Sequence, residues 1–150
     1  LSPGLSAFAL DNAWRPEAAA AANLSGNTII DVSDPSKAVS AIEYVRAQGA
    51  QHVTAWGTAE SAADACSLAP LIDALLLTRP VYAPDAFVAS ATESWPATMI
   101  QHGIRDDVAT RWEDAEKRAT VREYMAEHHV LTPAVARQRI QDAAEFLRSA

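Results

Sequence analysis

The sequence predicts a three-layer α/β/α domain with a mostly parallel sheet, and two observations support this prediction. Short apolar runs alternate with segments whose apolar residues recur at helical spacing, which is the order expected of a parallel sheet covered on both faces. The apolar run that begins at Thr98 stops at Gly103, and Asp106 and Asp107 follow within four residues. Ligands of such sheets collect outside the carboxyl ends of the strands, so this run indicates a strand that presents an acid to a site.

The first half of the chain contains two expected helices and two expected strands. Pro16 opens an alanine-rich helix over residues 16–24, because proline suits the first turn of a helix. A strand is expected over residues 27–32. Residues 33–35 supply cap side chains and a first-turn proline for a helix that ends at Gly49. A short apolar strand over residues 52–56 then ends at a glycine.

The second half continues the alternation with less certain boundaries between elements. A small-residue helix is expected over residues 59–68 and a strand over residues 74–78. Three prolines interrupt the passage that leads to the strand over residues 98–101. Residues 120–125 fit either the continuation of a helix or a final strand. The closing helix begins at Thr132 and Pro133, and its apolar residues form one stripe.

Length and charge restrict the possible functions. A chain of 150 residues with 49% hydrophobic residues fits one compact α/β domain over residues 1–150 with one core. The net charge of −7 would repel phosphate backbones and anionic lipid, and the chain has no basic stripe. We therefore expect no nucleic-acid partner.

The cysteine content and the absence of long apolar runs indicate the compartment. The single cysteine, Cys66, allows no internal disulfide and is expected to be a buried packing residue in a reducing environment. No segment reaches the roughly 20 apolar residues of a membrane span, and the first residues do not have the pattern of a signal peptide. We expect a cytoplasmic protein without membrane contact. The start at Leu1 suggests that an upstream segment was removed.

Three segments, in order, resemble the nucleophile, acid and histidine positions of the α/β-hydrolase family. Residues 52–61 resemble its strand and nucleophile elbow, 103–106 its acid-bearing strand end, and 127–133 the histidine loop before its closing helix. A hydrolytic triad needs a nucleophile on a sharp strand-to-helix turn, a histidine that takes its proton, and a carboxylate that holds the histidine tautomer. The resemblance covers the chain from about residue 27 onward and implies that Asp106 orients His129.

The elbow segment departs from the family pattern at its central position. The family has Gly-x-Ser-x-Gly, whereas this chain reads Gly57-Thr58-Ala59-Glu60-Ser61, so Ala59 stands where the attacking hydroxyl belongs. Three interpretations stay open: a natural non-catalytic relative, a serine deliberately replaced to trap a complex, or a chance likeness. Ser61 could be a displaced nucleophile, but a polar residue in a first helical turn is the simpler interpretation, because two residues along a helix turn a side chain to the opposite face.

The resemblance also implies an oxyanion site and no cofactor. Residues 2–5 resemble the family's oxyanion loop, so the backbone at Gly4 and Leu5 would join the N–H of Glu60 in binding an oxyanion. Neither phosphate-binding glycine pattern occurs among the five glycines, and we expect no nucleotide or other cofactor.

Each remaining site residue has a structural alternative. Asp106 could pair with Arg105 or cap the next helix, since aspartate is favoured at helix starts. His128 and His129 titrate near neutrality, yet adjacent histidines at the end of an element are often partly exposed rather than catalytic. A mixed imidazole and carboxylate metal site is conceivable, but no short-spacing motif supports it and we expect no metal. Its ligands would come from His102, Asp106, Asp107, His128 and His129.

Two functions from different classes therefore remain. The first is a hydrolase of a small ester, lactone or related acyl substrate, or an inactive relative of such an enzyme. The second is a non-catalytic binding or assembly module with a flavodoxin-like sheet. The acidic composition and the short sheet favour the second, because a truncated sheet leaves edges and apolar faces that a homo-oligomer can cover.

Overall fold

The structure is a computed structural model that describes residues 1, 13–81, 84–91, 94–106, 113–127 and 131–150. Among these residues the sheet has four strands in the order β1, β2, β3, β4, and every neighbouring pair is parallel. The strands are β1 (Thr54–Thr58), β2 (Ala74–Thr78), β3 (Ala97–Gly103) and β4 (Thr120–Tyr124). Sequence order and spatial order coincide, so the carboxyl ends of all four strands meet at one edge.

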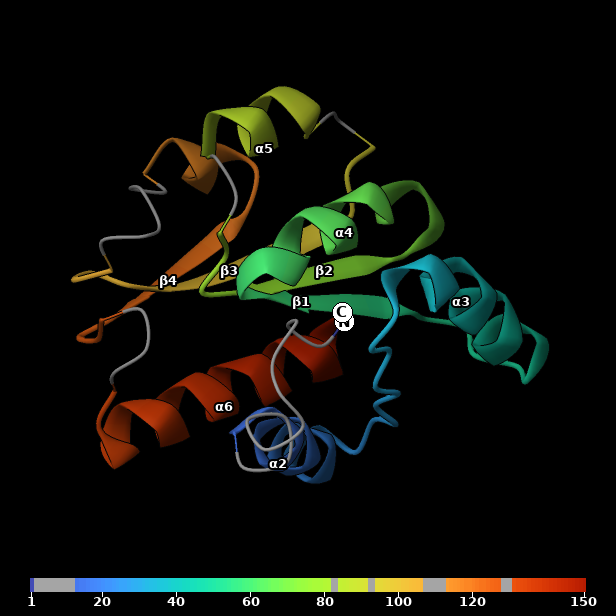
Figure 1. Ribbon diagram of the computed structural model, residues 1–150, viewed down its shortest axis with the longest axis horizontal. Helices are drawn as coiled ribbons and strands as arrows, with labels where there is room; N and C mark the ends of the chain where they lie inside the picture. Colours follow the sequence, from blue (N-terminus) through green and yellow to red (C-terminus); the bar gives the residue numbers. More distant parts are fainter. Residues whose placement is uncertain (2–12, 82–83, 92–93, 107–112, 128–130) are drawn as a thin grey trace.

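Helices lie on both faces of this sheet, which confirms the predicted three-layer α/β/α architecture (Figure 1). The α4 and α5 helices cover one face, α2 and α6 cover the other, and α3 lies beside β1 (Figure 1). The helices are α2 (Arg15–Ser25), α3 (Ala38–Ala47), α4 (Ala62–Ser67), α5 (Pro84–Ser90) and α6 (Pro133–Ser149). Short 3-10 turns occupy Pro35–Lys37, Ala59–Ser61, Ala69–Leu71 and Glu113–Lys117.

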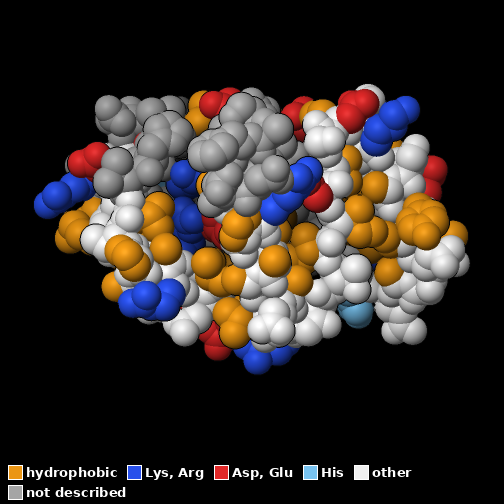
Figure 2. All heavy atoms as spheres, turned by 60° about the horizontal axis from the view of Figure 1, so that its bottom comes forward, with side chains coloured by type: hydrophobic (Ala, Val, Ile, Leu, Met, Phe, Trp, Pro, Cys, Tyr) orange, Lys and Arg blue, Asp and Glu red, His pale blue; other side chains and the backbone are white. Residues whose placement is uncertain are grey.

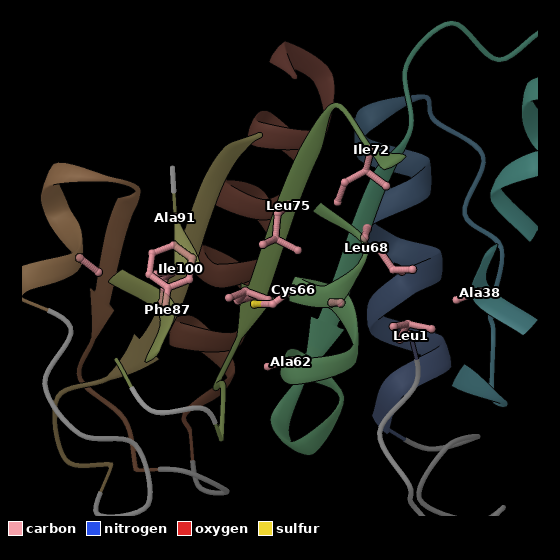
Figure 3. Close-up of a cluster of buried hydrophobic side chains, with 14 residues drawn as sticks. Leu1, Ala38, Ala62, Cys66, Leu68, Ile72, Leu75, Phe87, Ala91 and Ile100 are labelled. Carbon is pink, nitrogen blue, oxygen red and sulfur yellow. The ribbon is translucent and has the colours of Figure 1, made fainter. Parts of the chain in front are cut away.

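Two hydrophobic clusters, one on each face of the sheet, lie between the strands and the helices that cover them. One packs α4 and α5 on the sheet and contains Cys66, Leu75 and Phe87 among its buried side chains (Figure 3). The other, on the opposite face, joins α2 and α6 to Trp56 and Leu76. Every residue of β2 is buried, which explains its continuous apolar sequence, since a parallel strand covered on both faces has no polar side. As predicted, Cys66 is buried, and burial raises the pKa of its thiol to about 12.

The expected helix boundaries agree with local capping. The α2 helix ends at Gly26, whose φ of 78° gives a left-handed cap, the conformation that glycine adopts without a steric cost. The Asp34 side chain accepts a hydrogen bond from Ser36 N at 3.0 Å before the turn that leads into α3. Thr132 accepts from Val135 N at the start of α6, with Pro133 as its first residue.

The structure differs from the sequence prediction in two segments. Residues 27–32, predicted as a strand, form none; they run as irregular backbone between α2 and the turn that leads into α3, and Ile30 is 45% exposed. The passage with three prolines contains α5, which begins at Pro84. The ambiguous residues 120–125 are resolved as a strand, β4, that ends at Tyr124. No helix within the described ranges combines the length and the apolar character needed to cross a bilayer.

Candidate active site at the carboxyl edge of the sheet

The turn after β1 has the geometry of a nucleophile elbow. Thr58 ends the strand, Ala59 adopts a φ of 50°, and the chain enters α4 three residues later. A Cβ added to Gly57 would lie 2.6 Å from the Ala65 Cβ and 2.9 Å from the Ser61 carbonyl oxygen. The helix therefore returns so close over the strand that only glycine fits at position 57, and residue 59 lies at the apex of the turn.

Ser61 holds this turn together and does not present a nucleophile. Its buried hydroxyl accepts a hydrogen bond from Thr58 N at 2.9 Å and lies 2.8 Å from the Thr58 carbonyl oxygen, to which it can donate. These contacts keep the Ser61 hydroxyl oxygen hydrogen-bonded to the backbone of the turn. The interpretation of Ser61 as a residue of the first helical turn agrees with this geometry.

Glu60 follows the apex and is exposed, whereas Ala59 is buried. The Ala59 carbonyl oxygen accepts a hydrogen bond from Val81 N at 3.1 Å, which ties the apex to the segment after β2. Gly4 and Leu5, the other residues of the expected oxyanion site, lie outside the described residues.

Asp106 lies in a turn at the end of β3, at the same edge of the sheet. Its backbone N–H donates to the Gly103 carbonyl oxygen at 3.0 Å, and the residue is half-buried. A Cβ on Gly103 would lie 2.2 Å from the Ala126 carbonyl oxygen, and Arg105 N donates to that same oxygen at 3.1 Å. The structure therefore brings the segments that leave β3 and β4 into contact.

His128 and His129, of which His129 is predicted to pair with Asp106, follow closely after Ala126 in the sequence. His128 and His129, like Asp107, lie outside the described residues, so the pairing of Asp106 with His129 stays a prediction. Its support is that Ala126, two positions before His128, lies against the turn that holds Asp106.

Arg79 is a site residue that the sequence reasoning missed. It follows β2 directly, has a φ of 50° like Ala59, and is half-buried. Burial, the largest influence, lowers the pKa of its guanidinium, and Arg139 lowers it further, while the negative charges of Glu17, Asp106 and Glu60 act in the opposite direction. The Arg79 guanidinium is therefore close enough to Asp106 and Glu60 for their charges to act on it. A sequence signal was available: Arg79 is a charged residue directly after the apolar run of β2, and Asp106 likewise follows the end of a strand.

A buried ion pair lies close to Arg79. Arg139 of α6 contacts Glu17 of α2 at 2.7 Å, and both side chains are about nine-tenths buried. A buried charge is tolerated only with a partner, so this pair fixes α2 against α6 under the site.

A chain of hydrogen bonds crosses the sheet below the carboxyl edge. Trp56 Nε1 donates to Thr78 Oγ1 at 2.9 Å, and Thr78 Oγ1 donates to Gln101 Oε1 at 2.9 Å. Gln101 Nε2 lies 3.1 Å from Tyr124 Oη, which donates to Asp142 Oδ2 at 2.6 Å. Burial, followed by the bond to Asp142, raises the pKa of Tyr124. Each strand supplies one member, so the chain fixes the relative position of the strand ends.

His102 lies within this edge but does not form part of a metal site in the described residues. Its Nε2 lies 3.1 Å from Glu123 Oε1 and its Nδ1 lies 3.1 Å from the Gly103 carbonyl oxygen. Within the part of the chain that the structure describes, no group of three or more His, Cys, Asp or Glu side chains could hold a metal ion.

The larger of two hollows between the described residues is not at this edge. It has a volume of about 560 Å³ and lies beside the amino-terminal half of β1, away from Ala59. A small hollow of about 10 Å³ lies between Arg79, Tyr124 and Leu131, with room for about one water.

Comparison with known proteins supports the fold. A scan against protein-family models finds no match, and a search of curated proteins finds no similar sequence. Among solved structures, the chain is similar to the esterase domain of a Rhodothermus marinus protein, with a TM-score of 0.66 and 9% sequence identity. The alignment covers 89% of this chain and 79% of that chain. At this identity the similarity shows a shared α/β fold.

Proposed function

We propose that this chain is a hydrolase-like domain whose site was shaped for a small ester, lactone or related acyl substrate, and that it lacks the nucleophile. Ala59 occupies the nucleophile position, Asp106 is the acid, and His129 is the base. The backbone N–H of Glu60 is one oxyanion donor, and Gly4 and Leu5 supply the other. In this form the chain forms no acyl-enzyme.

The positive φ of Ala59 is the observation that supports this proposal most directly. An L-residue pays about 1–2 kcal/mol for left-handed backbone, and glycine would avoid most of that cost. Alanine gains nothing from this conformation. Serine would, because a turn of this kind presents its hydroxyl to the acid and the histidine of a triad. The backbone at position 59 therefore fits a function that the alanine side chain does not perform.

The test is to supply the hydroxyl. The Ala59→Ser variant is expected to hydrolyse p-nitrophenyl acetate at least about 10²-fold faster than the parent chain, the lower range of what a positioned base contributes. Intact-protein mass spectrometry is expected to detect an acetyl adduct at position 59. Ala63→Ser, a matched substitution at an exposed position of α4, is the control and should leave the background rate unchanged.

The triad assignment is tested in the same variant. Adding Asp106→Asn or His129→Ala to Ala59→Ser should remove the gain, because the histidine then lacks its orienting carboxylate or is itself absent. A folded Ala59→Ser variant with no gain over the parent would contradict the proposed function. A gain that survives both further substitutions would contradict the assigned acid and base.

A second function, a non-catalytic binding or assembly module, is favoured by a separate observation. The larger hollow lies beside β1 and not at the Asp106 turn, and the nucleophile position holds a methyl group. Light scattering distinguishes the two. An obligate oligomer whose Ala59→Ser variant is inactive supports assembly, whereas a monomer activated by that substitution supports the hydrolase origin.

A further inference from the structure

The outer edge of β1 offers backbone groups for a further strand. Among the described residues β1 is the first strand of the sheet and pairs only with β2. The Val53 carbonyl oxygen faces β2, where it accepts from Asp73 N at 2.9 Å. Outward and inward groups alternate along a strand, so the N–H and C=O groups of Thr54 and Trp56 point away from β2.

One residue of this chain already lies on that edge as a strand residue would. The Leu1 amine donates to the Trp56 carbonyl oxygen. The Leu1 carbonyl oxygen lies 3.1 Å from Ser61 Oγ, which accepts from Thr58 N at 2.9 Å and whose single proton can go to the carbonyl oxygen of either Leu1 or Thr58. In a parallel pair of strands, the N–H of a residue donates to the C=O of the residue before the one opposite it. Its own C=O accepts from the N–H of the residue after the one opposite it. Leu1 therefore stands opposite Gly57 in parallel register, with the Ser61 hydroxyl bridging the second bond.

The space beyond Leu1, toward the amino end of β1, is hollow and apolar. The hollow of about 560 Å³ runs alongside Thr54, Ala55 and Trp56. Figure 2 shows hydrophobic side chains gathered on the right of this face, in the region of α3. Aliphatic residues from three different segments line the hollow: Ile29, Ile30, Val32, Ile42, Val45 and Ile72.

Both walls of the hollow continue a core layer. Val32, Ile42 and Val53 pack against the cluster that contains Leu1, which Figure 3 shows beside Ala38. Ile29 packs against the cluster on the opposite face, which contains Trp14 and Trp56. A strand placed here would be covered on both faces, as β2 is, and such strands have continuous aliphatic sequences.

We propose that the outer edge of β1 and this hollow form the seat of one further β-strand, an extended aliphatic peptide segment that runs parallel to β1 in line with Leu1. Among the described residues, Thr54, Ala55 and Trp56 have no strand residue opposite them on this edge, so a segment of three to four residues fills the seat. This inference is independent of the proposed hydrolase origin.

The test places the segment in line with Leu1. A Val-Val-Ile-Val extension fused before Leu1 is compared with a Gly-Ser-Gly-Ser extension and with the parent chain. All three are measured at pH 8.5, where the parent amine is neutral. The aliphatic extension is expected to raise the melting temperature by several degrees, abolish the fluorescence of a hydrophobic dye, and slow hydrogen exchange at the Trp56 amide by at least about tenfold. The Ala55 amide, which faces β2, should not change.

Three results would overturn the proposal. The first is an aliphatic extension that behaves like Gly-Ser-Gly-Ser. The second is loss of dye fluorescence without slower exchange at Trp56, which would show a binding site for apolar molecules without strand pairing. The third is a parent chain that sediments as a dimer with its Trp56 amide already protected, which would show that a second copy covers the edge.

Discussion

Two residues without glycine's freedom, Ala59 and Arg79, adopt a φ of 50° directly after a strand. Strained backbone persists only where the surrounding structure enforces it, and it clusters at functional sites. At Ala59 the enforcing contacts are the bond to Val81 N and the close return of α4 over Gly57. Both strained residues lie at the carboxyl edge of the sheet, where the sequence placed the site.

Replacing Ala59 by glycine is expected to raise the free energy of unfolding by up to about 1 kcal/mol. Glycine removes the left-handed strain, and this gain exceeds the loss of one buried methyl group. Chemical denaturation measures the change. Ala62→Gly is the control: it is fully buried within α4, where glycine should lower stability by about 1 kcal/mol or more. A loss of similar size at both positions would show that the turn at residue 59 is not strained.

The residues of the site were predictable to different degrees. The strand ends near Ala59 and Asp106 were predictable because each follows an apolar run that stops abruptly, whereas the roles of the two residues stay predictions. Arg79 was missed although it follows the same rule, because an arginine has no place in a hydrolytic triad. Gln101 could not be found, since its hydrogen bonds to three other elements depend on the packing of the layers.

At the scale of elements, patterns confined to one segment were the most predictable. The apolar run of β2 and the capped apolar stripe of α6 predict their structures by themselves. A strand buried on both faces is continuously apolar, and a helix buried on one face has apolar residues at helical spacing. Residues 27–32 have a similar apolar pattern but form no strand, since a strand needs a partner and the hollow separates them from β1. The choice of strand for residues 120–124 depends on pairing with β3, which the segment alone does not encode.

The contact between β1 and α4 is the element-scale feature with the clearest test. Gly57→Ala is expected to lower stability by about 1–3 kcal/mol, because the new Cβ would meet Ala65 and the backbone at Ser61. Adding Ala65→Gly removes the nearest of these atoms. The double variant should therefore be more stable than the sum of the two single changes predicts, by roughly 0.5–2 kcal/mol. Strict additivity in a double-mutant cycle would show that α4 does not pack this closely on the strand.

At the scale of the whole molecule, polar groups connect the same layers that the hydrophobic clusters pack together. The hydrogen-bonded chain from Trp56 to Asp142 touches all four strands and α6, and the pair of Arg139 and Glu17 joins α6 to α2. A buried polar group that loses its partner is costly, so these bonds favour this arrangement of the layers over other equally apolar packings. These bonds hold the strand ends together at the carboxyl edge, whereas among the described residues no strand pairs with the outer edge of β1.

In a polypeptide that begins at Leu1, burial of the Leu1 amine makes the free energy of unfolding depend on pH. Burial lowers its pKa from 8.0 to about 6, and the charge of Asp31 offsets only part of this effect. Between these two values the unfolded chain binds a proton that the folded chain does not, so the free energy of unfolding rises with pH. The gain is at most about 2–3 kcal/mol, is complete above pH 8, and is lost as the pH falls to 6.

Acetylation of the amine isolates this contribution from those of the histidines and carboxylates. The acetylated chain keeps an N–H that can donate to Trp56, and it carries no charge at any pH. Denaturation curves of the two forms, collected from pH 5.5 to 8.5, should therefore differ most at the acid end and converge at the alkaline end. Curves that stay parallel over this range would mean that the amine is solvated in the folded chain, and the register of Leu1 opposite Gly57 would then lose its main physical support.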